Sequence, residues 1–101
     1  SYFGELVEVT PQVVAGSEPV TIRGRAVSRS TGAPVPYAGL SLVISVRGFE
    51  RTWEVHTDGA GEFVQVFTPG PGEAGVYDAS VVHPDLLDRP GQGGFVVSAV
   101  G

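Results

Sequence analysis

The side chains that could support nucleophilic catalysis are few and widely spaced in this chain. His56 and His83 are its only histidines. A Ser–His–Asp group would have to be built on His83, with Asp85 or Asp88 as the acid, in a connector that contains proline. The chain has no G-x-S-x-G motif, the turn that exposes a hydrolase serine. We therefore expect His83 to precede Pro84 on an exposed loop and to have no catalytic role.

Carboxylates form a second candidate set, because glycoside hydrolysis needs two of them about 5–9.5 Å apart. Glu50, Glu54 and Asp58 recur every four residues. At about 3.3 Å per residue in a strand, neighbours in this series lie about 13 Å apart. That separation is too large for a catalytic pair, so we expect these side chains on a solvated strand face.

Loop carboxylates could also bind a cation, since Ca²⁺ prefers oxygen ligands. The two candidate segments are Asp58–Glu62 and Asp85–Asp88. Neither has the D-x-D-x-D-G spacing of an EF-hand loop, and the chain has no cysteine for zinc or an iron–sulfur cluster. We expect turn and capping roles for both segments, and neither a metal nor a cofactor.

Aromatic residues offer a binding surface only if they are exposed. Trp53 is the single tryptophan, and we expect it in the core, where sandwich domains often bury one. The alternative is an exposed Trp53 on which a sugar could stack. We expect Tyr2, Phe3, Tyr37 and Phe49 near loops or ends, where they could contact a neighbouring domain.

Charge and composition exclude several kinds of partner. The net charge is −5 and all six basic residues are Arg, which argues against nucleic acid and against an anionic membrane surface. Without Cys the chain has no disulfide, and without Asn it has no N-glycosylation site. No apolar run approaches the roughly 20 residues of a membrane helix. Because the chain starts at Ser1 rather than Met, we expect it to be part of a longer protein.

Strands must position all of these groups, because no segment has helical periodicity. Val20–Val27 has the clearest alternation, with Arg23 and Arg25 opposite the apolar side chains. We expect the 101 residues to form one domain, 1–101. The seven expected strands are Glu5–Val9, Val20–Val27, Leu40–Val46, Arg51–Thr57, Glu62–Thr68, Gly75–Val82 and Gly94–Val100, and Val13 and Val14 continue the first past a kink.

Turn signals separate these strands. We expect hairpin turns at 47–50 and 58–61, which make most neighbours antiparallel, and one helical turn over 84–88. A single sheet would leave an apolar face in water, so two sheets must stack. The sequence therefore predicts an all-β, seven-stranded, mostly antiparallel β-sandwich.

The order of motifs between residues 20 and 82 resembles a bacterial pattern. Its parts are a V-x-G-x-V-like strand at Ile22–Val27, a T-G-x-P-V-x-x-A turn at Thr31–Ala38, a strand at Leu40–Ile44, a T-D-x-x-G-x-F turn at Thr57–Phe63 and a G-x-Y opening at Gly75–Tyr77. Together they resemble carboxypeptidase regulatory-like, transthyretin-like or Cna-B-type (prealbumin-like) modules.

This resemblance implies an immunoglobulin-like or transthyretin-like sandwich without catalytic activity, often repeated in tandem on bacterial surface or secreted proteins. The chain departs from it in two ways. It lacks the Lys of the branch that forms isopeptide cross-links, so that chemistry cannot occur. The lead-in Ser1–Gly16 is longer than the pattern, which leaves a general bacterial Ig-like domain as an alternative.

The motif residues have expected physical roles. Gly24 lets a strand or an aromatic ring approach closely. In the segment 57–61, Thr57 and Asp58 bond to turn amides and the two glycines adopt the tight geometry. Phe63 and Tyr77 fill the core between the sheets.

These observations predict a non-catalytic spacer, structural or adhesion module, not an enzyme, of a bacterial cell-surface or secreted protein. The expected location is extracellular or at the cell surface, with the periplasm as the alternative. Its expected partners are neighbouring domains of the same chain, and an extracellular protein or a glycan. The alternative is an accessory domain that binds carbohydrate or protein and is attached to an enzyme.

Overall fold

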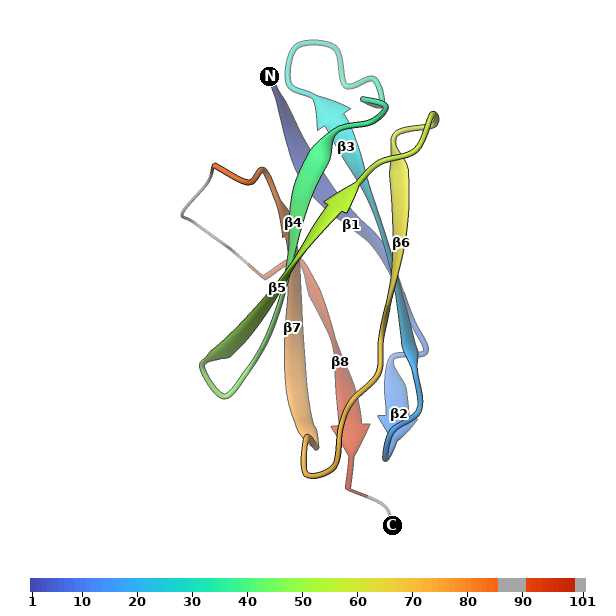
Figure 1. The fold of residues 1–101 in the computed structure, drawn as a ribbon, viewed down its shortest axis with the longest axis vertical. Coiled ribbons are helices and arrows are strands. Elements are labelled where there is room, and N and C mark those ends of the chain that lie inside the picture. Colours follow the sequence, from blue (N-terminus) through green and yellow to red (C-terminus); the bar gives the residue numbers. More distant parts are fainter. Residues whose placement is uncertain (86–90, 100–101) are drawn as a thin grey trace.

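Eight strands in two packed sheets make up the fold, seen in a computed structural model that describes residues 1–85 and 91–99 (Figure 1). The molecule is elongated, with extents of 47 × 25 × 17 Å. The strands are β1 (Tyr2–Thr10), β2 (Val13–Ala15), β3 (Val20–Ser28), β4 (Gly39–Val46), β5 (Phe49–His56), β6 (Glu62–Phe67), β7 (Gly75–Val82) and β8 (Gly93–Ser98).

The strand order defines the type of sandwich. A three-stranded sheet has the order β1-β3-β6, and a five-stranded sheet has the order β2-β8-β7-β4-β5. All strand pairs are antiparallel except β2 with β8. Neither sheet closes on itself, so the two layers form an open β-sandwich rather than a barrel. The predicted β-sandwich is confirmed, and it is mostly antiparallel as expected.

The strand count differs from the prediction of seven, because the N-terminal segment forms two strands in different sheets. β1 pairs with β3, whereas β2 leaves that sheet and runs parallel to β8. Pro11 lies between them and has no N–H to donate, so the β1 ladder cannot continue through it. Val13 and Val14 therefore belong to an eighth strand rather than to a kinked extension of the first.

The two predicted hairpins also differ in outcome. The first is correct, but its turn contains only Arg47 and Gly48, both with positive φ, so β5 already begins at Phe49. The second prediction is wrong: the turn at 58–61 joins β5 in one sheet to β6 in the other. A Gly-rich turn can join two strands of one sheet or two strands of different sheets. Here the core-facing residues of β5 and β6 lie in opposite layers, so the turn connects the two sheets.

Residues of both sheets meet in the core as their alternation predicts. In β3, Val20, Ile22 and Ala26 are fully buried. Phe63 and Tyr77 are also buried, as expected. The full set of buried core residues is Val9, Val14, Val20, Ile22, Ala26, Ala38, Leu40, Leu42, Ile44, Val55, Phe63, Phe67, Tyr77, Val81, Phe95 and Val97.

Gly24 has the role expected of it. A Cβ atom at this position would lie 2.4 Å from Cε2 of Phe63 and 3.0 Å from the carbonyl oxygen of Glu5. Only glycine therefore lets the Phe63 ring lie against the centre of β3.

The remaining expectations concern the C-terminal part of the chain. β7 has the predicted bounds, whereas β8 ends at Ser98 and Val100 lies outside the described residues. Pro84 and Asp85 form a turn. The rest of the predicted helical turn, 86–88, lies outside the described residues. Among the described residues, no helix has the length and apolarity needed to span a membrane.

Candidate functional site

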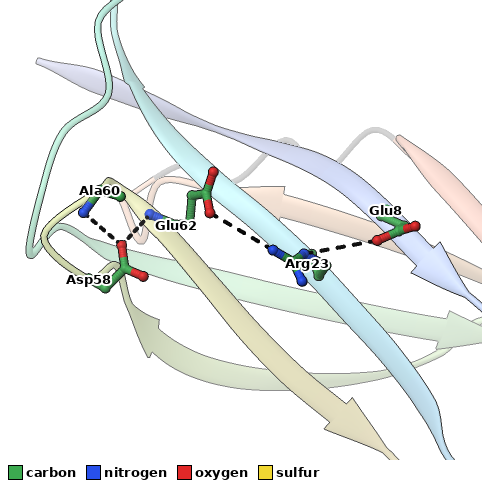
Figure 2. Close-up of polar contacts among 5 residues, drawn as sticks. All are labelled: Glu8, Arg23, Asp58, Ala60 and Glu62. Atoms are coloured by element: carbon green, nitrogen blue, oxygen red, sulfur yellow. Dashed lines mark hydrogen bonds and ion pairs between the residues drawn. The ribbon is translucent and has the colours of Figure 1, made fainter.

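The outer face of the three-stranded sheet carries a ladder of ion pairs. Arg25 Nε lies 2.7 Å from Glu5 Oε1. One step along, Arg23 lies between two carboxylates, with its Nε 3.9 Å from Glu8 and its Nη2 4.0 Å from Glu62 (Figure 2). The strand register produces this arrangement, because Glu5 is opposite Arg25 and Glu8 is opposite Arg23.

A β-bulge in β1 helps to set this register. The pairing with β3 shifts between Leu6 and Glu8, so Val7 is an extra residue whose side chain is exposed. Without the shift, Glu8 would point to the opposite face of the sheet, because a one-residue slip moves each side chain across the pleat. The bulge therefore places Glu8 next to Arg23.

Asp58 lies in the turn that leads into β6, at the end of this face where β6 begins. Its Oδ1 accepts hydrogen bonds from the backbone amides of Ala60 at 2.8 Å and Glu62 at 3.0 Å (Figure 2). The Glu62 amide, and after it the Ala60 amide, hold the pKa of the Asp58 carboxyl below its ordinary value, because they stabilise the charged form. Asp58 is therefore an ionised cap of the turn.

Thr57 ties the same turn to the loop before β4. Its buried hydroxyl donates to the carbonyl of Val35 at 2.8 Å and accepts from the amide of Ala38 at 2.8 Å. Gly61 has φ 80° and packs against Pro34 of that loop. Gly59 has no positive φ, so only Gly61 has the expected conformational role.

A shallow hollow of about 410 Å³ lies between this turn, the loop after β3 and the sheet. The guanidinium of Arg29 lies over the ring of Phe3, 5.5 Å from its centroid, beside this hollow. The lining residues are Phe3, Glu5, Arg25, Val27, Gly32, Pro34, Ala60 and Glu62.

The charged side chains of this face are paired with one another at the surface. The ion-paired side chains are 37% to 56% exposed, so each pair contributes only about 0–1 kcal/mol to stability. Asp58 and Glu62 do not form a cation site, because the Glu62 carboxylate points toward Arg23 while Asp58 binds amides (Figure 2). Within residues 1–85 and 91–99, no group of three His, Cys, Asp or Glu side chains could hold a metal ion.

The structure brings His83 and Asp85 together, but not in a triad geometry. Nδ1 of His83 accepts the backbone amide of Asp85 at 3.1 Å and lies 3.9 Å from its carboxylate. The imidazole lies against the ring of Tyr2, with 4.7 Å between centroids. His83 is thus half-buried rather than on an exposed loop, because Tyr2 covers it. Asp88 lies outside the described residues.

The three spaced carboxylates do not meet. Glu50 and Glu54 lie on the exposed outer face of β5, where Glu54 accepts a hydrogen bond from Ser41 Oγ at 3.4 Å. Asp58 lies beyond the strand in the turn already described. The solvated face expected for Glu50 and Glu54 is confirmed.

The aromatic residues are divided between core and surface. Trp53 is only partly buried, so its expected place in the core is correct in part: it packs edge-on against Phe67, 5.8 Å between centroids. Tyr2 is also partly buried and donates to the Gly39 carbonyl at 2.8 Å. Tyr37 and Phe49 are 76% and 77% exposed, at opposite ends of the β4–β5 hairpin. Phe3 lies under Arg29, as described above.

Two polar connections were not predicted from the sequence. Glu73 bonds to Arg51 and to the amide of Gly70, and its backbone carbonyl accepts the Tyr77 hydroxyl. Gln92 links β1 to β7, since it accepts from the Leu6 amide at 2.8 Å and donates to the Val81 carbonyl at 2.9 Å.

One sequence signal could have indicated the Tyr77 contact. A tyrosine near the start of the sixth predicted strand suits the tyrosine corner of immunoglobulin-like sandwiches, in which its hydroxyl bonds to backbone a few residues upstream. Gln92 gave no such signal, because its partners lie far away in sequence.

Comparison with known proteins does not assign a family. No protein-family model matches the sequence, and no curated protein matches it significantly.

Proposed function

We propose that this chain is a non-catalytic spacer module of a bacterial cell-surface or secreted protein, and that it carries load along its long axis. Its resemblance to carboxypeptidase regulatory-like, transthyretin-like and Cna-B-type modules supports this role. So does the strand order, since β1-β3-β6 and the β8-β7-β4-β5 part of the second sheet resemble the A-B-E and G-F-C-C′ order of immunoglobulin-like sandwiches, an architecture that many cell-surface domains share.

The observation that carries the proposal is the position of the first and last strands. β1 starts at one end of the 47 Å axis, and β8 ends at the other (Figure 1). Many domains instead have their two ends close together. In this arrangement, each copy in a series would add nearly its full length to the distance between its neighbours.

The hydrogen bonds at both ends suit axial load. β1 is joined to β3 by eight register pairs, and β2 runs parallel to β8 over three. The bonds from Val96 N to Gln12 O at 2.9 Å and from Gly16 N to Ser98 O at 3.1 Å extend the second ladder. Pulling Tyr2 and Ser98 apart slides these strands along one another. Since interstrand hydrogen bonds lie across the strands, such a pull loads them together.

The accessory ligand-binding role has less support. Stacking of a sugar ring calls for exposed aromatic side chains on one face. Tyr37 and Phe49, the two most exposed aromatic residues of the described chain, lie at opposite ends of a hairpin. Trp53 is partly buried against Phe67 rather than presented to solvent.

Small-angle X-ray scattering of a tandem duplication of residues 1–101 tests the spacer role. The single copy, extrapolated to zero concentration, is the reference. We expect the duplicated chain to have a maximum dimension close to twice the 47 Å of one copy. A duplicated chain hardly longer than the single copy, with its two units side by side, would refute the proposal.

A further inference from the structure

The edges of the two sheets differ in how well they are protected from pairing with another chain. An exposed edge strand presents unpaired backbone groups, and proteins usually block it with charge, bulges, short length or a covering segment. β5 carries Glu50, Arg51 and Glu54, and β2 has only three residues. β1 has the bulge at Val7, and its Leu6 amide is bonded to Gln92.

β6 has none of these protections between Phe63 and Phe67. This segment, Phe-Val-Gln-Val-Phe, has no charge, no proline and no glycine, and its residues favour extended structure. Val64 and Val66 are 55% and 49% exposed on the outer face. β6 is therefore an open, apolar edge.

The direction of the backbone groups of β6 follows from one bond. The Ala26 amide donates to the Gly61 carbonyl at 2.9 Å, and Ala26 and Gly61 continue the register in which Gly24 is opposite Phe63. Hydrogen-bonded pairs alternate along an antiparallel ladder. Phe63, Gln65 and Phe67 therefore direct their backbone groups toward β3. Glu62, Val64 and Val66 direct theirs away from it.

Glu62 is blocked by the turn before it. Its amide donates to Asp58 Oδ1 at 3.0 Å, and its carbonyl accepts the Asp58 amide at 2.7 Å. At Val66 the carbonyl accepts a bond from the Gln65 side chain at 3.2 Å. In the described part of the chain, the Val64 amide, the Val64 carbonyl and the Val66 amide have no such partner.

We propose that β6 pairs with β6 of a second copy of this chain, antiparallel and about a two-fold axis at Gln65. Val64 then lies opposite Val66 of the second copy, and Val66 opposite Val64. The two residues of each pair exchange two backbone hydrogen bonds, once the Gln65 side chain releases the Val66 carbonyl. The two three-stranded sheets become one six-stranded sheet.

The edge is complementary to itself, which favours a second copy over an unrelated strand. A two-fold contact requires each residue to suit its opposite number. In this register valine meets valine, a favourable cross-strand pair, and Gln65 meets Gln65. Glu62 lies opposite Thr68 rather than another carboxylate, so the acidic chain places no like charges directly opposite each other.

Analytical ultracentrifugation over a concentration series tests the pairing. We expect the wild-type chain to convert from monomer to dimer as concentration rises. Val64→Lys should weaken the dimer at least about tenfold, since it places an ammonium group on the apolar edge. The control is Val76→Lys, in the inner strand β7 of the other sheet, where the side chain is 72% exposed. That variant should dimerise like wild type. At a protein concentration at which wild type is monomeric, both variants should keep the wild-type melting temperature, because dimerisation then adds nothing to stability.

A cysteine cross-link tests the register. The chain has no cysteine, so Gln65→Cys introduces a single thiol, which in the dimer faces its own copy within the 4.4–6.8 Å Cα separation of a disulfide. Thr52→Cys places the same thiol at the β5 edge as the control. We expect oxidation to link Gln65→Cys chains into dimers and to leave Thr52→Cys chains mostly unlinked.

Three results would overturn the pairing. The first is a wild-type chain that stays monomeric at every concentration. The second is cross-linking of Thr52→Cys in preference to Gln65→Cys. The third is growth beyond the dimer, which would show that β6 adds strands without a closing two-fold axis.

Discussion

Among single residues, Thr57 connects the turn between β5 and β6 to the loop between β3 and β4. Its hydroxyl satisfies a partly buried carbonyl at Val35 and a buried amide at Ala38. Thr57→Val keeps the shape but leaves both groups unpaired, so we expect the free energy of unfolding to fall by about 3 kcal/mol. Urea titration measures this loss. Thr57→Ser keeps the hydroxyl and should cost only about 1 kcal/mol, for the lost methyl group. Equal losses in the two variants would contradict this role.

Asp58 makes stability depend on pH. Its pKa in the folded state lies below the ordinary value of about 3.9, so its stabilising effect is fully present above that pH. The effect is lost as pH falls from about 4 through the folded-state pKa, because the protonated acid accepts the two amides less well.

Asp58→Asn should therefore lose less stability than wild type between pH 7 and pH 3. Urea unfolding at both values measures the difference. Asp85→Asn, which removes a carboxylate whose side chain is 91% exposed, is the control and should follow wild type. If Asp58→Asn has the same pH dependence as wild type, the cap does not act through its charge.

At the scale of single residues, the sequence predicted roles that depend on local geometry. Gly24, Asp58 and the buried Phe63 were all expected. The role of Gly59 was not correct, since a glycine in a turn does not by itself reveal its φ. Gln92 could not be predicted, because its two partners are set by how β1 and β7 come together.

At the scale of elements, Tyr77 fixes the connection between β6 and β7. Its ring stacks on Phe95, 4.9 Å between centroids, and its hydroxyl donates to the Glu73 carbonyl. Tyr77→Phe keeps the ring and loses this bond, so we expect a loss of about 1–2 kcal/mol in the free energy of unfolding. Tyr37→Phe, at an exposed position, should change it by less than about 0.5 kcal/mol. A Tyr77→Phe variant as stable as wild type would contradict the importance of this corner.

The sequence predicted where the strands lie better than it predicted which strands pair with each other. The alternation of β3 and the bounds of β7 follow from local pattern alone. The turn at 58–61 looked like a hairpin, because Asp and Gly favour any tight reversal. Whether the next strand returns to the same sheet depends on which layer buries Phe63 and Phe67, and local sequence does not contain that information. The same reason hid the change of sheet at Pro11.

At the scale of the whole molecule, we propose that load runs from β1 to β8. The ladders of β1 with β3 and of β2 with β8 lie along this path. The ion-pair ladder on the outer face adds little to it, since exposed pairs contribute about 0–1 kcal/mol each. Resistance to force should therefore depend on the direction of pulling more than on surface charge.

Single-molecule force spectroscopy with two attachment geometries measures whether the fold resists force along this path. In the double variant Ser1→Cys/Ala99→Cys, force applied through the two thiols acts along the long axis. In Ser1→Cys/Ser30→Cys, the force peels β1 from β3 one hydrogen bond at a time. The native chain has no cysteine, so no other thiol competes for attachment. We predict a several-fold higher unfolding force for the axial pair at the same loading rate. Equal forces in the two geometries, or a lower force along the axis, would contradict it.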